Sequence, residues 1–218
     1  MQSKIKCAVF DLDGTLVNTI DDLANCCNIL LKKYGYNYSW SESDYKRFVG
    51  NGARKLVDRA FGGRLSESEL DSIYAEFKPL YKNSMLDNAY VYDGVKEQLD
   101  NLKAAGLKLC VVTNKPSAAA KGMVEHFFGE GYFDCISGVV DGKPTKPDPY
   151  TTLLALETVG CKAEDAIYFG DSNVDMKTAK NAGIEAIGVT WGFRSFEELF
   201  AEDPSVIIDE PSYISKLI

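Results

Sequence analysis

The sequence has little that would suit a secreted, membrane-bound or nucleic-acid-binding protein. A membrane span needs about 20 consecutive apolar residues, whereas the first apolar run ends at Phe10 and is followed directly by acidic residues. Basic residues are in deficit, with 24 Lys and Arg against 32 Asp and Glu, which gives a formal net charge of −8. Without a basic tract to offset this charge, we expect neither nucleic acid nor a membrane as a partner.

The cysteine patterns that mark zinc sites and disulfide frameworks are also missing. The six cysteines are scattered, with one adjacent pair, at Cys7, Cys26, Cys27, Cys110, Cys135 and Cys161. They form no Cys-x-x-Cys motif and no Cys/His group of the kind that zinc needs. This spacing favours a reducing compartment, and with no signal-peptide pattern at the N-terminus we expect a cytoplasmic protein.

What is present is the pattern of an α/β core. Four short apolar runs are typical of strands buried on both faces of a parallel sheet, namely residues 5–10, 107–113, 166–170 and 185–191. Helical patterns that end on glycine lie between them, at residues 95–106, 149–160 and 174–183. This alternation predicts a doubly wound, Rossmann-like parallel sheet with flanking helices.

The segment after the first strand follows a different period. Residues 18–85 contain only helical apolar spacing, and Ser66 and Glu69 form a capping-box pattern before the last helix. We therefore predict a small all-helical domain over residues 18–85, inserted into a core domain built from residues 1–17 and 86–218.

The first strand ends in Asp11-Leu12-Asp13-Gly14-Thr15. In doubly wound folds, ligands bind at the carboxyl ends of the strands. Two carboxylates at such an end could divide the work of a reaction, because one can attack an electrophile while the other moves a proton. The motif alone is equally compatible with an ordinary turn cap.

Three further strand ends also carry polar residues. Thr113 and Asn114 offer a hydroxyl and an amide that suit phosphoryl oxygens, and Lys146 stands in a loop stiffened by two prolines. Asp171 and Asp175 offer two carboxylates to a hard cation such as Mg²⁺. Each motif alone would also fit a turn, a solvated lysine or a helix cap, but their recurrence at four strand ends favours a catalytic site.

The order Asp/Asp, Thr, Lys, Asp/Asp resembles the haloacid dehalogenase superfamily over essentially the whole chain. The helical insertion is similar to the α-helical cap domain of that superfamily. Three short segments resemble its phosphoglycolate phosphatase branch: TNKP at 113–116, KPDP at 146–149 and Trp191-Gly192-Phe193. The resemblance implies a phosphatase, because dehalogenases and phosphonatases replace the second aspartate, Asp13, and because Thr15 is more similar to phosphatases than to mutases.

The resemblance also implies a role for each core residue in phosphoryl transfer. Asp11 would be the nucleophile that forms an aspartyl-phosphate, and Asp13 would be the general acid and base. Thr113 and the backbone of Asn114 would hold the phosphoryl group, while Lys146 would neutralise its charge.

The cofactor implied by the resemblance is Mg²⁺. Its ligands would be Asp11, the carbonyl of Asp13, and Asp171, with Asp175 supporting the water shell of the ion. A cation is physically necessary in such a mechanism, because an anionic nucleophile must approach an anionic phosphate.

Substrate choice is expected to come from a glycine-rich turn in the helical insertion. Gly50, Asn51 and Gly52 would present backbone N–H groups to an anion, and Arg54 could bind a carboxylate or a second phosphate. A solvated arginine at a connecting turn is the alternative.

We expect a monomeric or homodimeric phosphatase for a small phosphorylated metabolite, with 2-phosphoglycolate the first candidate. The alternatives are hydrolysis of pyrophosphate or of sugar and nucleotide monophosphates, a β-phosphoglucomutase-like isomerase, and a non-catalytic phosphate-binding module.

Overall fold

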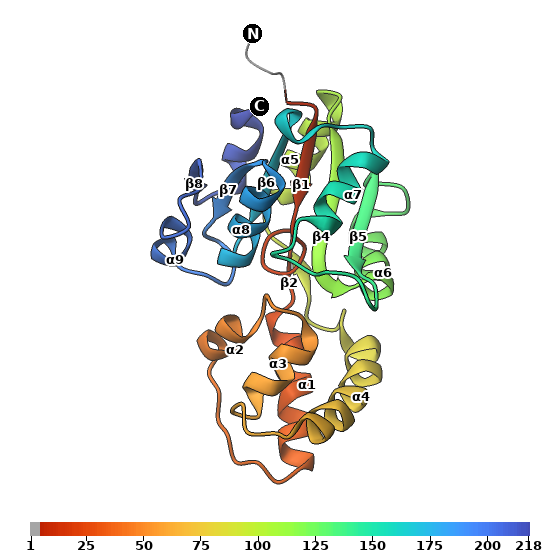
Figure 1. The fold of residues 1–218 in the computed structure, drawn as a ribbon, viewed down its shortest axis with the longest axis vertical. Helices are drawn as coiled ribbons and strands as arrows, with labels where there is room; N and C mark the ends of the chain where they lie inside the picture. Colours follow the sequence, from red (N-terminus) through yellow and green to blue (C-terminus); the bar gives the residue numbers. More distant parts are fainter. Residues whose placement is uncertain (1–4) are drawn as a thin grey trace. The chain divides into compact units, whose positions relative to one another are not determined.

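A computed structural model describes residues 5–218, so the first four residues of the expected core range lie outside the described part of the chain. The chain divides into two compact units, one formed by Met1–Asn18 with Val91–Ile218 and the other by Thr19–Tyr90 (Figure 1). The sequence placed the second junction at residue 85. In the structure the junction falls at a short strand, β3 (Tyr90–Val91), which pairs with β2 (Val17–Asn18) where the chain leaves the first unit.

The larger unit contains a six-stranded parallel sheet, as the sequence predicted. Its order is β5-β4-β1-β6-β7-β8, so the chain proceeds from β1 in one direction and then returns to the other side of β1. The strands are β1 (Cys7–Phe10), β4 (Lys108–Pro116), β5 (Cys135–Val139), β6 (Ala166–Gly170), β7 (Glu185–Val189) and β8 (Val206–Ile208). The direction reverses between β1 and β6, which is where doubly wound folds bind ligands.

Two features of this sheet were not predicted. The edge strands β5 and β8 are short or partly exposed, so they lack the continuous apolar run that identifies the inner strands. In addition, β4 does not end at Thr113 as expected. It continues to Pro116, because pairing with β5 resumes there after an irregular register that begins at Val112.

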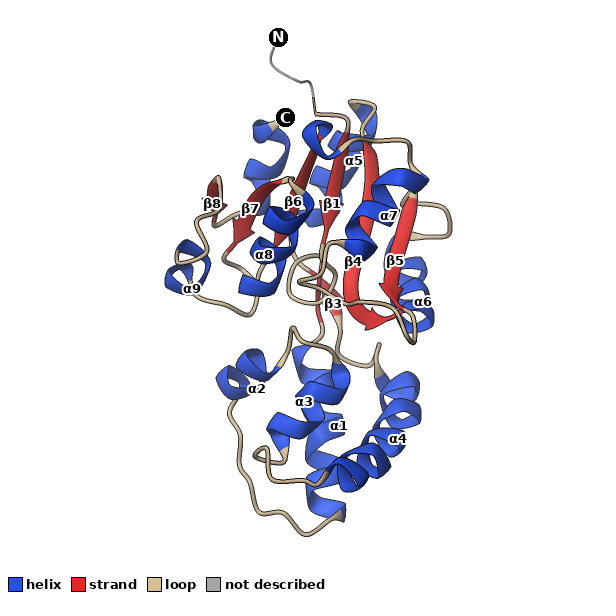
Figure 2. Cartoon of the chain, viewed as in Figure 1, coloured by secondary structure: helices blue, strands red, loops and turns tan. Residues whose placement is uncertain are grey.

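Helices lie on both sides of the sheet (Figure 2). They are α5 (Val95–Ala104), α6 (Ser117–Phe128), α7 (Tyr150–Thr158), α8 (Asn173–Ala182) and α9 (Phe196–Phe200), with two 3-10 segments, η1 (Ala163–Asp165) and η2 (Pro211–Leu217). Residues of α7 and α8, including Ala155 and Met176, form one apolar cluster with Val9 and Val112 of the inner strands. Within residues 5–218, none of the helices is long and apolar enough to cross a bilayer.

The second unit consists of four helices, α1 (Ile20–Lys33), α2 (Glu42–Phe48), α3 (Ala53–Ala60) and α4 (Glu67–Ser84). The predicted capping box is present at the start of α4, where Ser66 accepts from the backbone of Glu69 and the Glu69 carboxylate accepts from the backbone of Ser66. A second box of the same kind starts α2. These caps satisfy backbone donors that a helix start leaves without partners.

A buried carboxylate closes this helical unit. Asp22, in the first turn of α1, is only 1% exposed. It accepts hydrogen bonds from the backbone N–H groups of Asn88 and Ala89, both at 3.0 Å, and from the Asn88 side-chain amide at 2.8 Å. Asp22 therefore joins the first helix of the unit to the segment that leaves it. The sequence did not reveal this, because acidic residues are common in the first turn of any helix.

We predict that Asp22→Ala lowers the free energy of unfolding by about 2–4 kcal/mol, because it removes several hydrogen bonds to a charged, buried acceptor. The matched control is Asp21→Ala on the same helical turn, where the side chain is exposed and a change within about 0.5 kcal/mol is expected. Urea denaturation followed by circular dichroism measures both. Equal losses for the two variants would show that Asp22 does not close the unit.

Candidate active site

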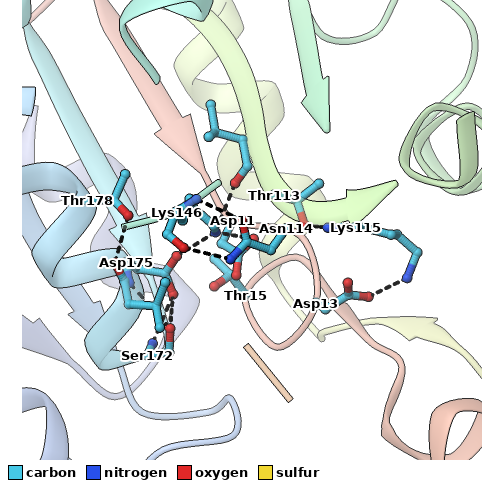
Figure 3. Close-up of polar contacts among 12 residues, drawn as sticks. Asp11, Asp13, Thr15, Thr113, Asn114, Lys115, Lys146, Ser172, Asp175 and Thr178 are labelled. Atoms are coloured by element: carbon cyan, nitrogen blue, oxygen red, sulfur yellow. Dashed lines mark hydrogen bonds and ion pairs between the residues drawn. The ribbon is translucent and has the colours of Figure 1, made fainter. Parts of the chain in front are cut away.

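Three buried carboxylates meet at the carboxyl end of the sheet. Asp11 follows β1 directly, Asp171 follows the neighbouring β6, and Asp175 lies in the first turn of α8. One ligand oxygen from each of the three lies within 4.8 Å of the others. Asp11 and Asp175 are drawn in Figure 3. The point where the strand order reverses has therefore gathered the acidic residues that the sequence singled out.

Lys146 stands among these carboxylates. Its Nζ lies 2.8 Å from Asp11 Oδ1 and 2.7 Å from Asp175 Oδ1, and it donates to the Val112 carbonyl at 3.1 Å (Figure 3). The Asn114 side chain fixes the loop that carries it, accepting from the Lys146 backbone N–H at 2.9 Å and donating to the Lys146 carbonyl at 3.1 Å. The sequence offered the amide and the backbone of Asn114 to phosphoryl oxygens. The role of its side chain in holding the Lys146 loop was not foreseen.

The charges of the cluster do not balance. When ionised, the three carboxylates leave a formal charge of −2 beside the single ammonium of Lys146. Burial and then the nearby Asp175 raise the pKa of Asp11 well above its usual value, and the same two causes raise the pKa of Asp171 to about 7. Burial alone would lower the pKa of Lys146, but the charges of Asp11 and Asp175 outweigh it and the pKa is raised.

This imbalance, together with the chemistry of the donors, fits a divalent cation. The donor set consists of carboxylate oxygens, which Mg²⁺ prefers over nitrogen or sulfur. A charge of +2 would offset the formal −2 of the cluster and allow all three carboxylates to stay ionised. The buried carboxylates of Asp11, Asp171 and Asp175 therefore suit a divalent cation such as Mg²⁺. Coordination by the Asp13 carbonyl stays a prediction.

Asp171 is held in one orientation by its neighbours. The Thr15 hydroxyl donates to Asp171 Oδ1 at 3.1 Å, and the Phe193 backbone N–H donates to Oδ2 at 2.8 Å. Two glycines make room for it, since a Cβ at Gly14 or at Gly192 would lie 2.3 Å from an atom of the Asp171 side chain. Gly14 also has a φ of +92°, which L-residues with side chains rarely adopt.

Asp175 has the helix-cap role that the sequence offered as an alternative, and it also belongs to the acidic cluster; its support of a bound cation stays a prediction. Its carboxylate caps α8, accepting from the Ser172 hydroxyl at 2.6 Å and the Ser172 backbone N–H at 3.1 Å. Its other oxygen, Oδ1, contacts Lys146 Nζ and lies 3.4 Å from the hydroxyl of the buried Tyr168. A helix cap and a site residue are thus the same side chain here, and the cap fixes its position.

A second ion pair lies beside this cluster. Lys115 Nζ is 2.8 Å from Asp13 Oδ1, and the side chains are 3% and 14% exposed (Figure 3). The Lys115 backbone N–H also donates to the hydroxyl of Thr113 at 3.2 Å. Sequence reasoning missed Lys115 as a site residue. The signal was present, because Thr113 and Lys115 are two positions apart on a strand and therefore share a face.

The remaining predicted substrate-binding residues lie in the Thr19–Tyr90 unit: Gly50, Asn51 and Gly52 in the turn before α3, and Arg54 in the first turn of α3. The turn has the glycine conformations that were expected, with φ of 115° at Gly50 and 87° at Gly52. The Arg54 guanidinium forms ion pairs with Glu67 at 2.6 Å and Asp71 at 2.8 Å. Its contact with a substrate stays a prediction.

Comparisons with known proteins place this chain among hydrolases and phosphatases by similarity. The profile of the family described as haloacid dehalogenase-like hydrolase matches residues 8–189. A phosphoglycolate phosphatase of Agrobacterium fabrum is 35% identical over 97% of this chain and 93% of its own, and one of Vibrio parahaemolyticus is 33% identical over 100% and 97%. The structure of a predicted phosphoglycolate phosphatase from Haemophilus somnus has a TM-score of 0.89 at 31% identity, covering 98% and 97% of the chains.

We predict that Mg²⁺ stabilises the folded protein more strongly as the pH rises. The pKa of Asp171 is raised to about 7 in the folded, metal-free chain. The folded state therefore binds more protons than the unfolded state between pH about 4 and 7, and its stability falls as the pH rises through that window. Because Mg²⁺ must displace this proton, its binding is weaker at pH 5.5 than at pH 8.

Thermal unfolding with and without Mg²⁺ at pH 5.5 and 8 measures this effect. At about 100 times its dissociation constant, the ion would add about 2.7 kcal/mol. Asp171→Asn should remove most of the stabilisation at both pH values. A shift in melting temperature that is independent of pH, or that persists in Asp171→Asn, would contradict the assignment of the cation site.

Proposed function

The chain belongs to the haloacid dehalogenase-like hydrolase family, and we propose that it is a Mg²⁺-dependent phosphatase that cleaves a small phosphomonoester through an aspartyl-phosphate on Asp11. The observation that carries this proposal is the buried cluster at the reversal point of the sheet. It combines a carboxylate that could act as nucleophile, a fixed ammonium and buried carboxylates that suit a divalent cation. The relatives named phosphoglycolate phosphatase support the same reaction class.

In this proposal, Asp11, the backbone carbonyl of Asp13, and Asp171 would hold Mg²⁺, and Asp175 would support its water shell. Carboxylate oxygens of Asp11, Asp171 and Asp175 lie within 4.8 Å of one another. When bound, the ion would neutralise charge on Asp11 and on the phosphoryl oxygens. This matters for Asp11 in particular. Burial and the charge of Asp175 raise its pKa, and a protonated carboxyl group is a poor nucleophile.

The reaction then has two displacement steps. In the first, an Asp11 carboxylate oxygen bonds to phosphorus while the ester bond breaks, and Asp13 gives its proton to the leaving oxygen. In the second, a water oxygen attacks the same phosphorus, Asp13 takes up the water proton, and Asp11 is released together with phosphate. Thr113 and the Asn114 backbone hold the phosphoryl oxygens, and Lys146 balances their charge.

The Lys115–Asp13 pair favours substrates with an anionic leaving group. The leaving oxygen takes its proton at Asp13, and the Lys115 ammonium lies 2.8 Å from that carboxylate. In 2-phosphoglycolate the carboxylate is bonded to the carbon that bears the ester oxygen, so it would reach the ammonium. Pyrophosphate also has an anionic leaving group, whereas in sugar phosphates the neighbouring groups are neutral. We therefore keep 2-phosphoglycolate as the first candidate and pyrophosphate as the second.

The first test is phosphate release with Mg²⁺ over 2-phosphoglycolate, pyrophosphate, nucleoside monophosphates and hexose phosphates. We expect the highest kcat/KM for 2-phosphoglycolate. If pyrophosphate were the best substrate, the second candidate would replace the first. If no phosphate were released from any of them, the proposed activity would be wrong.

We predict that Asp13→Asn slows hydrolysis of an alkyl phosphate by about 10²–10⁴-fold, the usual contribution of proton transfer. The loss should be smaller for p-nitrophenyl phosphate, because its leaving group departs readily without a proton. Asp141→Asn, an exposed aspartate on a turn, is the matched control and should leave both rates unchanged. The same loss for both substrates would argue against Asp13 as the general acid.

We predict that Lys115→Met lowers kcat/KM for 2-phosphoglycolate about 10–150-fold more than for 2-hydroxyethyl phosphate, which has a hydroxymethyl group in place of the carboxylate. This range corresponds to about 1.5–3 kcal/mol for a hydrogen bond to a charged group. Lys115→Arg should restore part of the preference. Arg54→Ala, assayed on the same two substrates, tests the arginine that the sequence predicted as a substrate contact. Equal losses on both substrates would mean that Lys115 only orients Asp13.

A further inference from the structure

Folding brings four of the six cysteines to one face of the sheet. They belong to, or pack against, a single apolar cluster: Cys7 on β1, Cys110 on β4, Cys135 on β5 and Cys161 after α7. All four are free thiols, and the sulfurs of Cys7 and Cys110 are 3.7 Å apart. These residues are far apart in the sequence, which is why their spacing gave no sign of a cluster.

Strand register decides which of the sheet cysteines could be joined. Cys110 and Cys135 are direct partners in the β4–β5 ladder. Paired strands are about 4.8 Å apart, and a disulfide spans about 4.4–6.8 Å between Cα atoms. Cys7 and Cys110 are offset by two residues, because Cys110 pairs with Val9. This offset adds about 6.6 Å along the strand and places their Cα atoms roughly 8 Å apart, which is too far for a disulfide.

The two partners differ in reactivity. Cys135 is partly exposed on the edge strand β5, whereas Cys110 is completely buried. A hydrogen bond from the Cys110 thiol lowers the pKa of Cys135 to about 7, and the Ser137 and Thr158 hydroxyls act in the same direction. Cys135 is therefore a partly exposed residue whose sulfur is partly thiolate at neutral pH, and the thiolate is the reactive form. Cys110 is held next to it as the thiol.

We propose that Cys135 and Cys110 form an oxidisable pair, in which a hydroperoxide reacts with Cys135 and Cys110 completes a disulfide. In the first step, the Cys135 thiolate attacks one peroxide oxygen and the O–O bond breaks. This gives a sulfenic acid and an alkoxide or hydroxide, which takes up a proton. In the second step, the Cys110 sulfur attacks the Cys135 sulfur, an S–S bond forms and water leaves. The sulfurs lose two electrons, and the peroxide gains them.

Oxidation of this pair would act on the active site through β4. Cys110 lies three residues before Thr113 and five before Lys115 on the same strand. A covalent link between Cys110 and Cys135 ties β4 to β5 next to the register irregularity that begins at Val112. We therefore expect the oxidised protein to have a lower turnover number, and a thiol reductant to restore it.

The experiment treats the full chain with hydrogen peroxide, alkylates the remaining thiols and maps the peptides by mass spectrometry. Trypsin alone leaves Cys135 and Cys161 on one peptide, because prolines follow Lys143 and Lys146. A second digestion at Glu157 separates them. We expect a peptide pair linked through Cys110 and Cys135, and a fall from six free thiols to four, at least tenfold faster than in Cys135→Ser.

Cys26→Ala is the matched control, because Cys26 is buried in the other unit, and it should be oxidised at the wild-type rate. Phosphate release is assayed before and after the addition of dithiothreitol. A link through Cys7 or Cys161, or thiol loss at the same rate in Cys135→Ser, would overturn the proposal. A Cys110–Cys135 link that leaves turnover unchanged would overturn its effect on the site. The peptide map does not depend on the proposed phosphatase activity.

Discussion

The structure depends on holding three buried carboxylates, Asp11, Asp171 and Asp175, around a single ammonium group. Burial of a charge without a partner costs several kcal/mol, and the ion pairs to Lys146 compensate only part of this cost. The part of this cost that is not compensated appears as the raised pKa values of Asp11 and Asp171. A divalent cation would remove the imbalance, and the proposed function assigns that cation as Mg²⁺.

Much of the surrounding fold serves to keep these groups in place. The reversal of strand order next to β1 brings Asp11 and Asp171 to neighbouring strand ends. The backbone at Gly14 and Gly192 lies so close to the Asp171 side chain that neither position could carry a side chain of its own. Because electrostatic catalysis requires groups that do not have to reorganise during the reaction, these packing constraints belong to the catalytic design as well as to the fold.

The inner strands and the acidic motifs could be predicted because each leaves a local signal. The run at 166–170 is an apolar strand followed at once by Asp171, and the structure has β6 over the same residues. Strand spacing could have placed Lys115 on the same face as Thr113, but the partners of Lys115 and Asp22 could not be predicted in this way. Each contacts a residue far away in the chain, Asp13 or Asn88, so the contact exists only after folding. Likewise, Asn114 was predicted as a phosphate ligand, and only the loop geometry shows its second role in holding Lys146.

The strand β4 connects the proposed thiol pair with the candidate active site. It carries Cys110 of the proposed thiol pair, Thr113, which is proposed to hold the phosphoryl group, and Lys115 beside Asp13. In the proposed mechanism, small shifts of this strand would therefore reach both the phosphoryl group and the leaving group. We therefore propose β4 as the element through which a change at the sheet edge alters catalysis.

The central claim is that Asp11 carries the phosphoryl group during turnover. The most direct test is to mix the Mg²⁺-loaded protein with 2-phosphoglycolate, quench with acid within milliseconds and locate any added phosphoryl group by peptide mass spectrometry. The account predicts the mass of one phosphoryl group on Asp11 at early times, and its absence in Asp11→Asn. Phosphate release at the wild-type rate by Asp11→Asn, or a phosphoryl group on a different residue, would contradict it.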